Sequence, residues 1–392
     1  MLKREAEDTL RFLLKKTPVV ALTGPRQSGK TTLARGLFPQ KPFISLEDPQ
    51  SRSDCRDDPR SFLDNFPKGG IIDEVQRCPE LLPFLRNRVE AEGRPGLFIL
   101  TGSQKNRLLS RLHQELSDRV AGLELLPLSL REKAHFGEKP KNIDRTLLSG
   151  AFPALHRRVG TCRAWFGDYM AAYLERDVRQ VLKVHELEVF QHFVRLCAGR
   201  TGQLLNYSAL AADCGITHNT AKAWISVLED GYMVFRLYPH QSHFKKRLVR
   251  VSKLYFYDTG LVSWLLGIKT PEQMENHPLR GGIFETFVIS ELMKSYCNRG
   301  KAPGFYFWRD SNGLEVDLLI KEKDRIQPLE IRPGKTVNRQ FFTALEKWTD
   351  LAGDLASDPV LIFGGAENSV HNKVRVMGWQ AGLTNWGQMK AA

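Results

Sequence analysis

Several signatures that would narrow the class of this protein at once are missing from its sequence. Its six cysteines form no CxxC pair and its ten histidines form no HExxH pair, which argues against zinc and disulfides and favours reduced thiols in a cytoplasm. No run of eighteen apolar residues occurs, so a membrane-spanning helix is excluded. The first residues mix both charge signs without an apolar segment, so we expect no secretory signal. These absences leave a cytoplasmic protein whose 392 residues suffice for two to four domains.

Positive charge is in excess, but it is unevenly distributed. The chain has 57 Lys and Arg against 44 Asp and Glu, a formal net charge of +13. Residues 195–270 carry 10 basic and 4 acidic side chains, whereas residues 271–392 carry 15 of each. A net positive charge favours an anionic partner. Its location predicts that a polyanion would bind in the third quarter of the chain.

A phosphate-binding loop lies near the start of the chain. Residues 24–31 match the pattern GxxxxGK[ST], between an expected strand at 18–22 and an expected helix at 31–37. Glycines let consecutive backbone N–H groups point at phosphate oxygens, and the start of the helix adds its positive end. In such a loop Lys30 would neutralise the β- and γ-phosphates and Thr31 would bind Mg²⁺. The residues expected to hold the nucleotide are Gly24, Pro25, Arg26, Gln27, Ser28, Gly29, Lys30, Thr31 and Thr32.

Apolar runs that end in polar residues complete this part of the chain. One run ends in Asp73 and Glu74, a layout in which the first carboxylate lies near Mg²⁺ and the second polarises the attacking water. Another ends in a Thr-Gly-Ser stretch, whose Ser103 could contact the γ-phosphate or that water. Because strands alternate with helices, we expect a parallel α/β domain with the nucleotide at the strand ends. No NKxD motif follows, which favours ATP over GTP. The runs lie at residues 43–46, 70–74, 97–100 and 122–126.

These motifs resemble those of a known family, the AAA-type P-loop ATPases of bacteria and archaea with a C-terminal DUF4143 region. The similarity covers nearly the whole chain, which implies that the chain shares the family's ATPase core and its C-terminal region. The segments that carry it beyond the phosphate-binding loop are IIDEVQ (71–76), TGSQ (101–104), LELLPLSLRE (123–132), SGAFPAL (149–155), YLERDVRQV (173–181), LYFYDTGL (254–261) and FETFVISEL (284–292).

The resemblance also implies a role for an arginine and for a lid. In that family an arginine precedes the PLS segment, and Arg119 matches its position, although Asp118 stands where the family has a glycine. Arg119 is thus implied as an arginine finger or sensor that stabilises phosphoryl charge from a neighbouring subunit of a homo-oligomer. The alternative is a surface arginine paired with Asp118. Residues 136–200 are implied to form a helical lid over the nucleotide, in which Arg176 and Arg179 fit a solvated face better than a sensor.

Helix, short turn, helix and strand follow one another in residues 204–238, which is the pattern of a winged helix. Asn206 is placed to cap the first helix, and either Thr217 or Asn219 to cap the second. A basic segment after the strand would form the wing, and such clusters can neutralise DNA phosphates without reading bases. Winged helices also dock proteins, so a protein partner is the alternative. The residues expected to contact nucleic acid are Lys222, Lys245, Lys246, Arg247 and Arg250, with Lys253 at the end of the wing.

Acidic residues recur in the last part of the chain, at Glu285 in an expected helix and at Asp317 and Glu330 in expected strands. A helix acid, a strand Asp and a Glu-x-base resemble the PD-(D/E)xK nuclease fold, in which acids hold Mg²⁺ and a lysine activates water. Arg332 takes the position of that lysine here, and arginine does not give up a proton readily. Lys335 could substitute for the lysine, or the site could be inactive.

The expected fold is therefore α/β. Its parts are a P-loop parallel-sheet ATPase domain (1–135), a helical lid (136–200), a winged helix (201–270) and a C-terminal α/β restriction-endonuclease-like domain (271–392). The expected function is that of an Mg²⁺-dependent, ATP-hydrolysing AAA-type ATPase, which acts as a nucleotide-driven switch or remodeller and contacts DNA through the winged helix. One alternative is an ATP-gated, metal-dependent DNA nuclease. The other is a protein-interaction switch that docks its partner through the winged helix.

Overall fold

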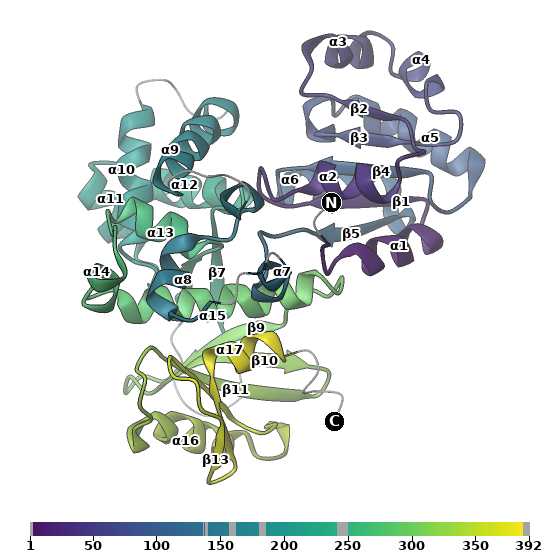
Figure 1. Cartoon of the computed structure of the whole chain (residues 1–392). Helices are drawn as coiled ribbons and strands as arrows, with labels where there is room; N and C mark the ends of the chain where they lie inside the picture. The colour runs from purple at the N-terminus through teal and green to yellow at the C-terminus, as the bar shows by residue number, and fades with distance from the viewer. Residues whose placement is uncertain are drawn as a thin grey trace.

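The computed structural model builds the chain around two sheets that are separate in space (Figure 1). It describes residues 3–135, 137, 140–156, 162–179, 186–240 and 250–386. The phosphate-binding loop belongs to the purple and blue part at the upper right of Figure 1, and the last strands form the yellow-green part at the bottom. No helix in these described ranges is long and apolar enough to cross a membrane.

The first sheet is parallel, as expected for the N-terminal part of the chain. Its five strands lie in the order β2-β3-β4-β1-β5, and each begins and ends within two residues of an expected run. Side chains of β1 alternate between two apolar layers: Val19 and Ala21 pack on one face, Val20 and Leu22 on the other. The strands are β1 (Val19–Thr23), β2 (Phe43–Ser45), β3 (Ile71–Asp73), β4 (Phe98–Gly102) and β5 (Val120–Glu124), and the helices of this part are α1 (Glu7–Lys16), α2 (Lys30–Leu37), α3 (Pro49–Asp57), α4 (Pro59–Asp64), α5 (Leu81–Glu92) and α6 (Asn106–Leu116).

Helices fill the middle of the chain. The expected helix-turn-helix is present, and its first helix is capped by Asn206, which accepts a hydrogen bond from the backbone N–H of Ala209. Thr217, and not Asn219, caps the second helix by accepting from the N–H of Thr220. The helices are α7 (Leu130–Ala134), α8 (Ile143–Ser149), α9 (Cys162–Tyr173), α10 (Leu187–Ala198), α11 (Tyr207–Cys214), α12 (His218–Asp230), α13 (Thr259–Leu265) and α14 (Pro271–Glu275), and a π-helical turn at Leu174–Val178 continues α9.

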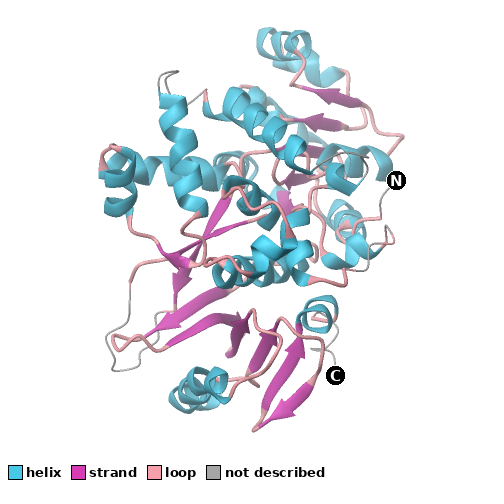
Figure 2. Ribbon diagram, turned by 60° about the vertical axis from the view of Figure 1, so that its left-hand side comes forward, coloured by secondary structure: helices cyan, strands magenta, loops and turns pink. Residues whose placement is uncertain are grey.

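The second sheet is mixed and has nine strands in the order β13-β14-β12-β11-β10-β9-β7-β8-β6. It crosses the boundary expected near residue 270, because β7 pairs in parallel with β9 at Tyr238–Tyr306 and Pro239–Phe307. Figure 2 shows these strands running as one layer from the helical part toward the C-terminal end. The strands are β6 (Gln203–Leu204), β7 (Val234–Pro239), β8 (Lys253–Phe256), β9 (Phe305–Arg309), β10 (Glu315–Glu322), β11 (Arg325–Arg332), β12 (Val360–Phe363), β13 (Ser369–His371) and β14 (Val374–Gly378), with helices α16 (Thr343–Ala352) and α17 (Trp379–Thr384) beside them.

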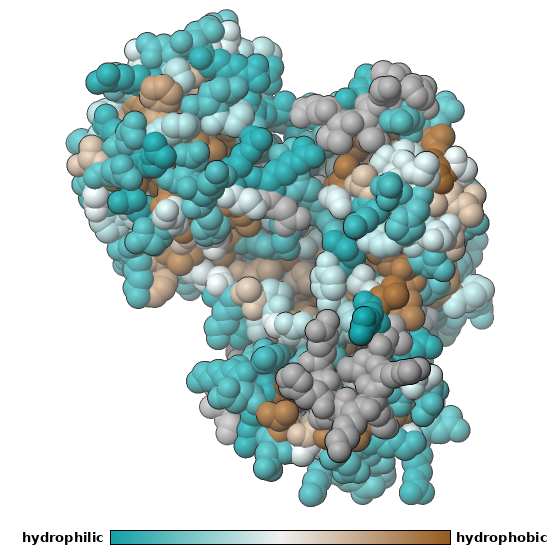
Figure 3. Space-filling view, turned by 180° about the vertical axis from the view of Figure 1, so that it is seen from behind, coloured by the Kyte–Doolittle hydropathy of each residue, from teal (hydrophilic) through white to brown (hydrophobic). Residues whose placement is uncertain are grey.

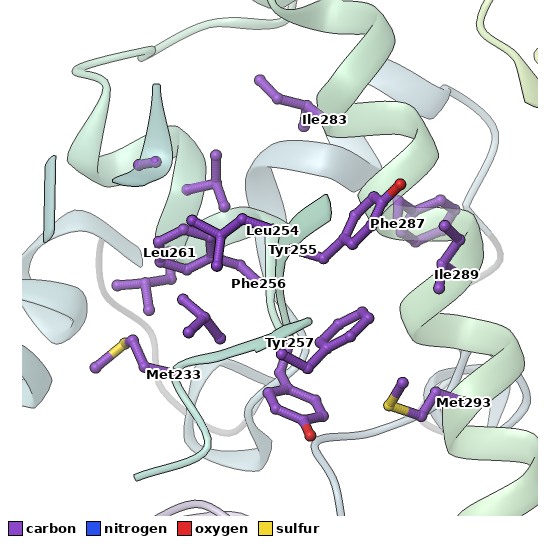
Figure 4. Packing of buried hydrophobic residues seen from close by; sticks show 14 of the residues in the cluster. Met233, Leu254, Tyr255, Phe256, Tyr257, Leu261, Ile283, Phe287, Ile289 and Met293 are labelled. Atoms are coloured by element: carbon purple, nitrogen blue, oxygen red, sulfur yellow. The ribbon is translucent and has the colours of Figure 1, made fainter. Parts of the chain in front are cut away.

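Helix α15 (Arg280–Cys297) ties the parts of the chain together. Its apolar side packs with β8 in one large core, where Tyr255 of β8 lies beside Phe287 of α15 (Figure 4). Two charged side chains near its end reach the segment that follows the first sheet. Glu291 accepts a hydrogen bond from the N–H of Leu130, and Lys294 donates to the carbonyl of Leu128.

The surface seen from behind is mostly hydrophilic (Figure 3). Hydrophobic side chains show in the hollow where the part built on the first sheet meets the rest of the molecule. The buried residues fall into several apolar clusters, and one of them extends from the lid through α11 and α12 to α15 and α17. The lid, the helix-turn-helix and the C-terminal region therefore share a core, while the first sheet keeps cores of its own.

Candidate functional site

The phosphate-binding loop runs from the end of β1 to the start of α2, at the carboxyl edge of the first sheet. Two of its residues must be glycines. Gly24 has φ 154°, and a Cβ there would lie 2.2 Å from the carbonyl oxygen of Leu125. Gly29 has φ 97°, in the left-handed region that side chains rarely adopt. The sequence pattern therefore corresponds to a backbone turn that other residues could not form without strain.

Lys30 begins α2 and lies beneath this loop. Its ammonium donates hydrogen bonds to the carbonyl oxygens of Gly24 and Pro25, both at 2.9 Å. Burial lowers the pKa of Lys30 from its ordinary value, while the carboxylates of Glu74 and Asp73 act in the opposite direction. The lysine is thus a buried cation whose hydrogen-bond partners are neutral.

Asp73, at the end of β3, accepts hydrogen bonds from three hydroxyls. Thr31 donates at 2.6 Å, Ser45 at 3.0 Å and Thr101 at 2.5 Å. The parallel order of the sheet explains this arrangement, since the carboxyl ends of β2, β3 and β4 meet at the edge that carries the loop. The structure thus brings together Thr31 and Asp73, the two residues that sequence analysis selected for Mg²⁺.

Glu74 follows Asp73 and has the unusual left-handed φ of 54°. Its Oε2 accepts hydrogen bonds from Ser103 at 3.0 Å and from the amide of Gln76 at 2.5 Å. Ser103 and Glu74, both selected from the sequence, therefore touch. Gln76 belongs to the IIDEVQ segment, but sequence reasoning gave it no role. Its position two residues after Glu74 is the signal that could have found it.

Arg26 links the loop to the lid. Its guanidinium binds both carboxylate oxygens of Asp177, at 2.6 and 3.0 Å, and Glu47 at 2.8 Å, and it lies 4.0 Å from Glu74. Burial by itself would lower the pKa of Arg26, but the hydrogen bonds and charges of these acids raise it above its ordinary value. Asp177 is 151 residues from Arg26 along the chain and comes from the π-helical turn, which no sequence pattern had indicated.

A cavity of about 450 Å³ opens between the loop and the lid. Lid residues Pro153, Ala154, Ala172 and Arg176 line it together with loop residues and both acids at the end of β3. The side chain of Arg176 is 57% exposed, which agrees with the expected solvated face, but that face borders the cavity, so a role as a sensor stays open. The π-helical turn that continues α9 brings Arg176 to this side. Arg179 does lie on an exposed face, paired with Glu175.

The residues at this cavity fit an Mg²⁺ ion that arrives with a nucleotide. Mg²⁺ takes one or two protein oxygens beside waters and substrate phosphates, and the Thr31 hydroxyl and the Asp73 carboxylate could supply them. In the described ranges no group of three His, Cys, Asp or Glu side chains is arranged to hold a metal ion. That finding is compatible with this site, where Asp73 would be the single carboxylate ligand. It argues against a metal site made of several acids in the C-terminal part of the chain.

Arg119 lies away from the loop. It comes just before β5, whose first residue, Val120, pairs with Val19 at the start of β1, whereas the loop follows the end of β1. It is therefore at the opposite edge of the sheet from Lys30. Its partner is Glu90, at 3.2 Å, and not Asp118 as the alternative expected. Its side chain is 41% exposed, so a role toward a neighbouring subunit stays a prediction.

The acids of the C-terminal part form a second site, which we call the C-terminal acidic cluster and define as Glu285, Glu315, Asp317 and Glu330. Asp317 accepts from the N–H of Ile331 at 2.8 Å and lies 3.4 Å from Arg332. Arg332 also binds Glu330. Burial raises the pKa of Glu330 to about 9, with the charge of Asp317 adding to the effect. The position of the lysine in the PD-(D/E)xK pattern is thus occupied by an arginine that contacts two of the acids.

Neither of the lysines considered from the sequence lies where it was expected. Lys335 extends away from the cluster and pairs with Glu275 at 3.1 Å. Lys253 is not an exposed wing residue: it is buried in β8, and its ammonium lies 2.9 Å from Glu285 and 2.5 Å from Glu315. Burial by itself would lower the pKa of Lys253, but these acids and Asp317 raise it above its ordinary value. In the sequence Lys253 is the last of several basic residues, so the change from loop to buried strand at this position could not be recognised there.

The remaining residues predicted for nucleic acid lie on the surface or outside the described ranges. Lys222 on α12 and Arg250 before β8 are exposed. Lys245, Lys246 and Arg247 lie outside the described residues. Contact with DNA therefore stays a prediction.

Three models of protein families match consecutive parts of the chain. Residues 16–134 match an AAA domain, residues 140–272 match a domain of unknown function, DUF8612, and residues 280–381 match another, DUF4143. Among solved structures, the Walker-type ATPase of Pyrococcus abyssi shares 18% identity over 68% of this chain and 96% of its own, with a TM-score of 0.40. AMPPCP-bound DnaA from Aquifex aeolicus shares 15% over 57% of this chain and 85% of its own, with a TM-score of 0.29.

Two mycobacterial proteins resemble the chain over most of its length. Uncharacterized protein Rv2008c of Mycobacterium tuberculosis is 32% identical over 350 residues, which are 88% of this chain and 77% of the relative. Uncharacterized protein Mb2031c of Mycobacterium bovis matches with the same values. The chain therefore belongs to the family of these two mycobacterial proteins, and within it residues 16–134 form an AAA domain of the P-loop type.

Proposed function

We propose that the chain binds ATP with Mg²⁺ at residues 24–32 and hydrolyses it. The observation that carries the proposal is the 2.6 Å contact between the Thr31 hydroxyl and Asp73, because these are the protein oxygens that Mg²⁺ needs beside the phosphates. Lys30, buried under the same loop, supplies positive charge for the β- and γ-phosphates. The lack of a guanine-reading NKxD motif favours ATP over GTP as the nucleotide.

Glu74 is the residue proposed to orient the attacking water. When bound, Mg²⁺ would neutralise charge on the phosphate oxygens, and the chain itself must hold the water and exclude others. Ser103 and Gln76 both bind Oε2 of Glu74, so its second oxygen is the one that would meet the water. The lid residues that line the cavity would cover it during the reaction.

The contact between Arg26 and Asp177 supports a switch. Phosphate oxygens arriving at the loop would compete with Asp177 and Glu47 for the guanidinium of Arg26, because both acids pair with it. Binding would therefore loosen the loop from the lid, and hydrolysis would restore the contact. The lid shares its core with α12 and α15, which gives such a movement a route to the rest of the chain.

DNA is the partner that the charge distribution favours for this switch. Residues 195–270 carry 10 basic and 4 acidic side chains, and the exposed Lys222 and Arg250 belong to that excess. A cluster of this kind binds phosphates through charge and without reading sequence. We extend the proposal to the wing residues Lys245, Lys246 and Arg247 on the sequence alone.

The deciding measurement is the rate of ATP hydrolysis with Mg²⁺, in the presence and absence of double-stranded DNA. Stimulation by DNA would support the switch with DNA as its partner, and hydrolysis without stimulation would favour a docked protein instead. Failure to hydrolyse ATP in both conditions would contradict the assignment of Glu74. A sample with EDTA controls for the metal.

A gel shift tests the wing separately. Charge reversal at Lys245, Lys246 and Arg247 should weaken DNA binding and reduce its dependence on salt. The matched control reverses Lys321, near the end of β10, and Lys323, in the turn that follows it, both of which are exposed. If the wing variant shifts DNA as well as the control does, these residues are not the contact.

A further inference from the structure

The C-terminal acidic cluster brings four carboxylates together, and the family resemblance implied a metal ion among them. We infer that the ammonium of Lys253 is the resident cation of this cluster and excludes a divalent metal from it. The cluster would then join β8 to the C-terminal part of the chain, and it would not be a cleavage centre. This inference stands independently of the proposed ATPase function.

The position of Lys253 is the first support. Its ammonium contacts carboxylates from two different elements, Glu285 of α15 at 2.9 Å and Glu315 of β10 at 2.5 Å. The side chain is only 4% exposed. In a nuclease-like site a metal cation would bind between two acids. A metal cation placed at this position would be repelled by the ammonium of Lys253.

The pairing of the remaining acids is the second support. Arg332 lies against both Asp317 and Glu330, and Arg309 lies 3.2 Å from Glu315. Each of the four carboxylates therefore contacts at least one ammonium or guanidinium. Metal ligands must present free oxygens to the ion, and in the part of the chain that the structure describes no three acidic, His or Cys side chains do so together.

Not every oxygen of the cluster is paired, since the bonds of Glu285 go to its Oε1 and those of Asp317 to its Oδ2. Oε2 of Glu330 is buried without a hydrogen bond, while the other oxygen of that carboxylate binds Arg332. These oxygens do not make a metal site, because Mg²⁺ and Mn²⁺ bind several oxygens in near-octahedral geometry and, among the described residues, no three such side chains are placed together to hold an ion. If the inference were wrong, the buried Oε2 of Glu330 would be the oxygen that binds the metal ion first.

The strand that carries Lys253 explains why the lysine stays in place. Lys253 and Tyr255 are two residues apart in β8 and therefore project to the same face, and both bind Oε1 of Glu285. Tyr255 lies against α15 in Figure 4. Because α15 also carries Glu285, the lysine fastens the strand to the helix in the way that a bridging metal would.

Binding of Mn²⁺ to nucleotide-free protein, followed by electron paramagnetic resonance, tests the inference without any activity assay. All samples carry Asp73→Asn, so that the nucleotide site contributes nothing. We expect the protein to bind Mn²⁺ no better than its Asp317→Asn variant. The Lys253→Met variant should gain one Mn²⁺ site that binds at least about tenfold more tightly than the parent protein does. The double variant Lys253→Met/Asp317→Asn should lose this site again.

Lys321→Met is the matched control, because Lys321 is exposed on the same strand as Asp317 and lies outside the cluster. It should bind Mn²⁺ as the parent protein does. The inference is overturned if the parent protein binds Mn²⁺ and Asp317→Asn abolishes that binding. It is also overturned if Lys253→Met folds but gains no site. Should Lys253→Met fail to fold, the comparison of the parent protein with Asp317→Asn still decides.

Discussion

The proposed nucleotide site and the C-terminal acidic cluster use the same kinds of side chain and hold them in opposite ways. Asp73 takes its hydrogen bonds from hydroxyls, and Lys30 gives its own to backbone carbonyls. In the C-terminal acidic cluster each carboxylate contacts a cation of the protein, as Glu285 contacts Lys253. Charges that the protein leaves unpaired are available to a ligand. Charges that it pairs internally serve the fold, and removing one partner exposes the other as a buried charge.

The contrast predicts that removing the lysine of the nucleotide site abolishes activity. Lys30→Ala should reduce ATP hydrolysis by at least about 100-fold, because the charge that stabilises the transferring phosphoryl group is gone. Glu74→Gln should reduce it by about 10²–10⁴-fold as expected for loss of a general base, but it should still bind ATP. Phosphate release and binding of a fluorescent ATP analogue check the two. Normal hydrolysis in either variant would remove the basis of the comparison.

The lysine of the C-terminal acidic cluster should matter for stability instead. Lys253→Met leaves Glu285 and Glu315 without their ammonium, and breaking a buried ion pair costs about 3–5 kcal/mol in the free energy of unfolding. Lys30→Met, whose partners are carbonyl oxygens, should cost no more than about 1.5 kcal/mol. Urea denaturation followed by circular dichroism measures both. Equal losses would show that the two lysines are held alike.

Weakening the link between loop and lid should change nucleotide affinity by a smaller factor. Asp177→Asn removes the charge that holds Arg26, so arriving phosphates no longer have to displace it, and we expect the Kd for ATP to fall about tenfold, equivalent to about 1.4 kcal/mol. Glu175→Gln, an exposed neighbour paired with Arg179, is the control and should leave the Kd unchanged. Weaker binding in Asp177→Asn would mean that the contact closes the lid over the nucleotide.

The smallest effects are expected from deleting one hydroxyl at each site. Tyr255→Phe removes a hydrogen bond to Glu285, which keeps its lysine, and should cost about 1 kcal/mol of unfolding free energy. Ser45→Ala removes one of the three hydroxyls on Asp73 and should change the Mg²⁺ concentration needed for hydrolysis more than the stability. Thermal unfolding and an Mg²⁺ titration separate these effects. If Ser45→Ala lowered the stability without changing the Mg²⁺ requirement, the contrast between the two sites would be weakened.

Much of the nucleotide site could be predicted because its residues are close in sequence or fixed by a parallel sheet. The loop is a contiguous pattern, and Asp73 and Ser103 follow apolar runs whose ends must meet at one edge. Arg119 could have been placed by the same rule, since a residue just before a strand lies at the opposite edge. Asp177 could not, because its position depends on a π-helical turn and on packing of the lid.

The C-terminal part was harder to predict because its contacts are long-range. Three acids were found from their strand and helix positions, but their partners come from other elements. Lys253 looked like the last residue of a basic loop, and only the pairing of β8 with β7 and β6 buries it. The parallel pairing of β7 with β9 has no local signal either, so the continuity of the sheet across residue 270 was not foreseen.

One contact made by the first described residues bears on where this protein can be cut. Arg4 is buried, and its guanidinium binds Glu132 and the carbonyl oxygens of Ser28 and Leu126. The AAA domain match begins only at residue 16, so an ATPase fragment trimmed to that match would lack Arg4. It would leave Glu132, which is 0% exposed, without its cation, and the loop at Ser28 without a brace. The folded unit that carries the phosphate-binding loop therefore starts before residue 16, where the AAA domain match begins.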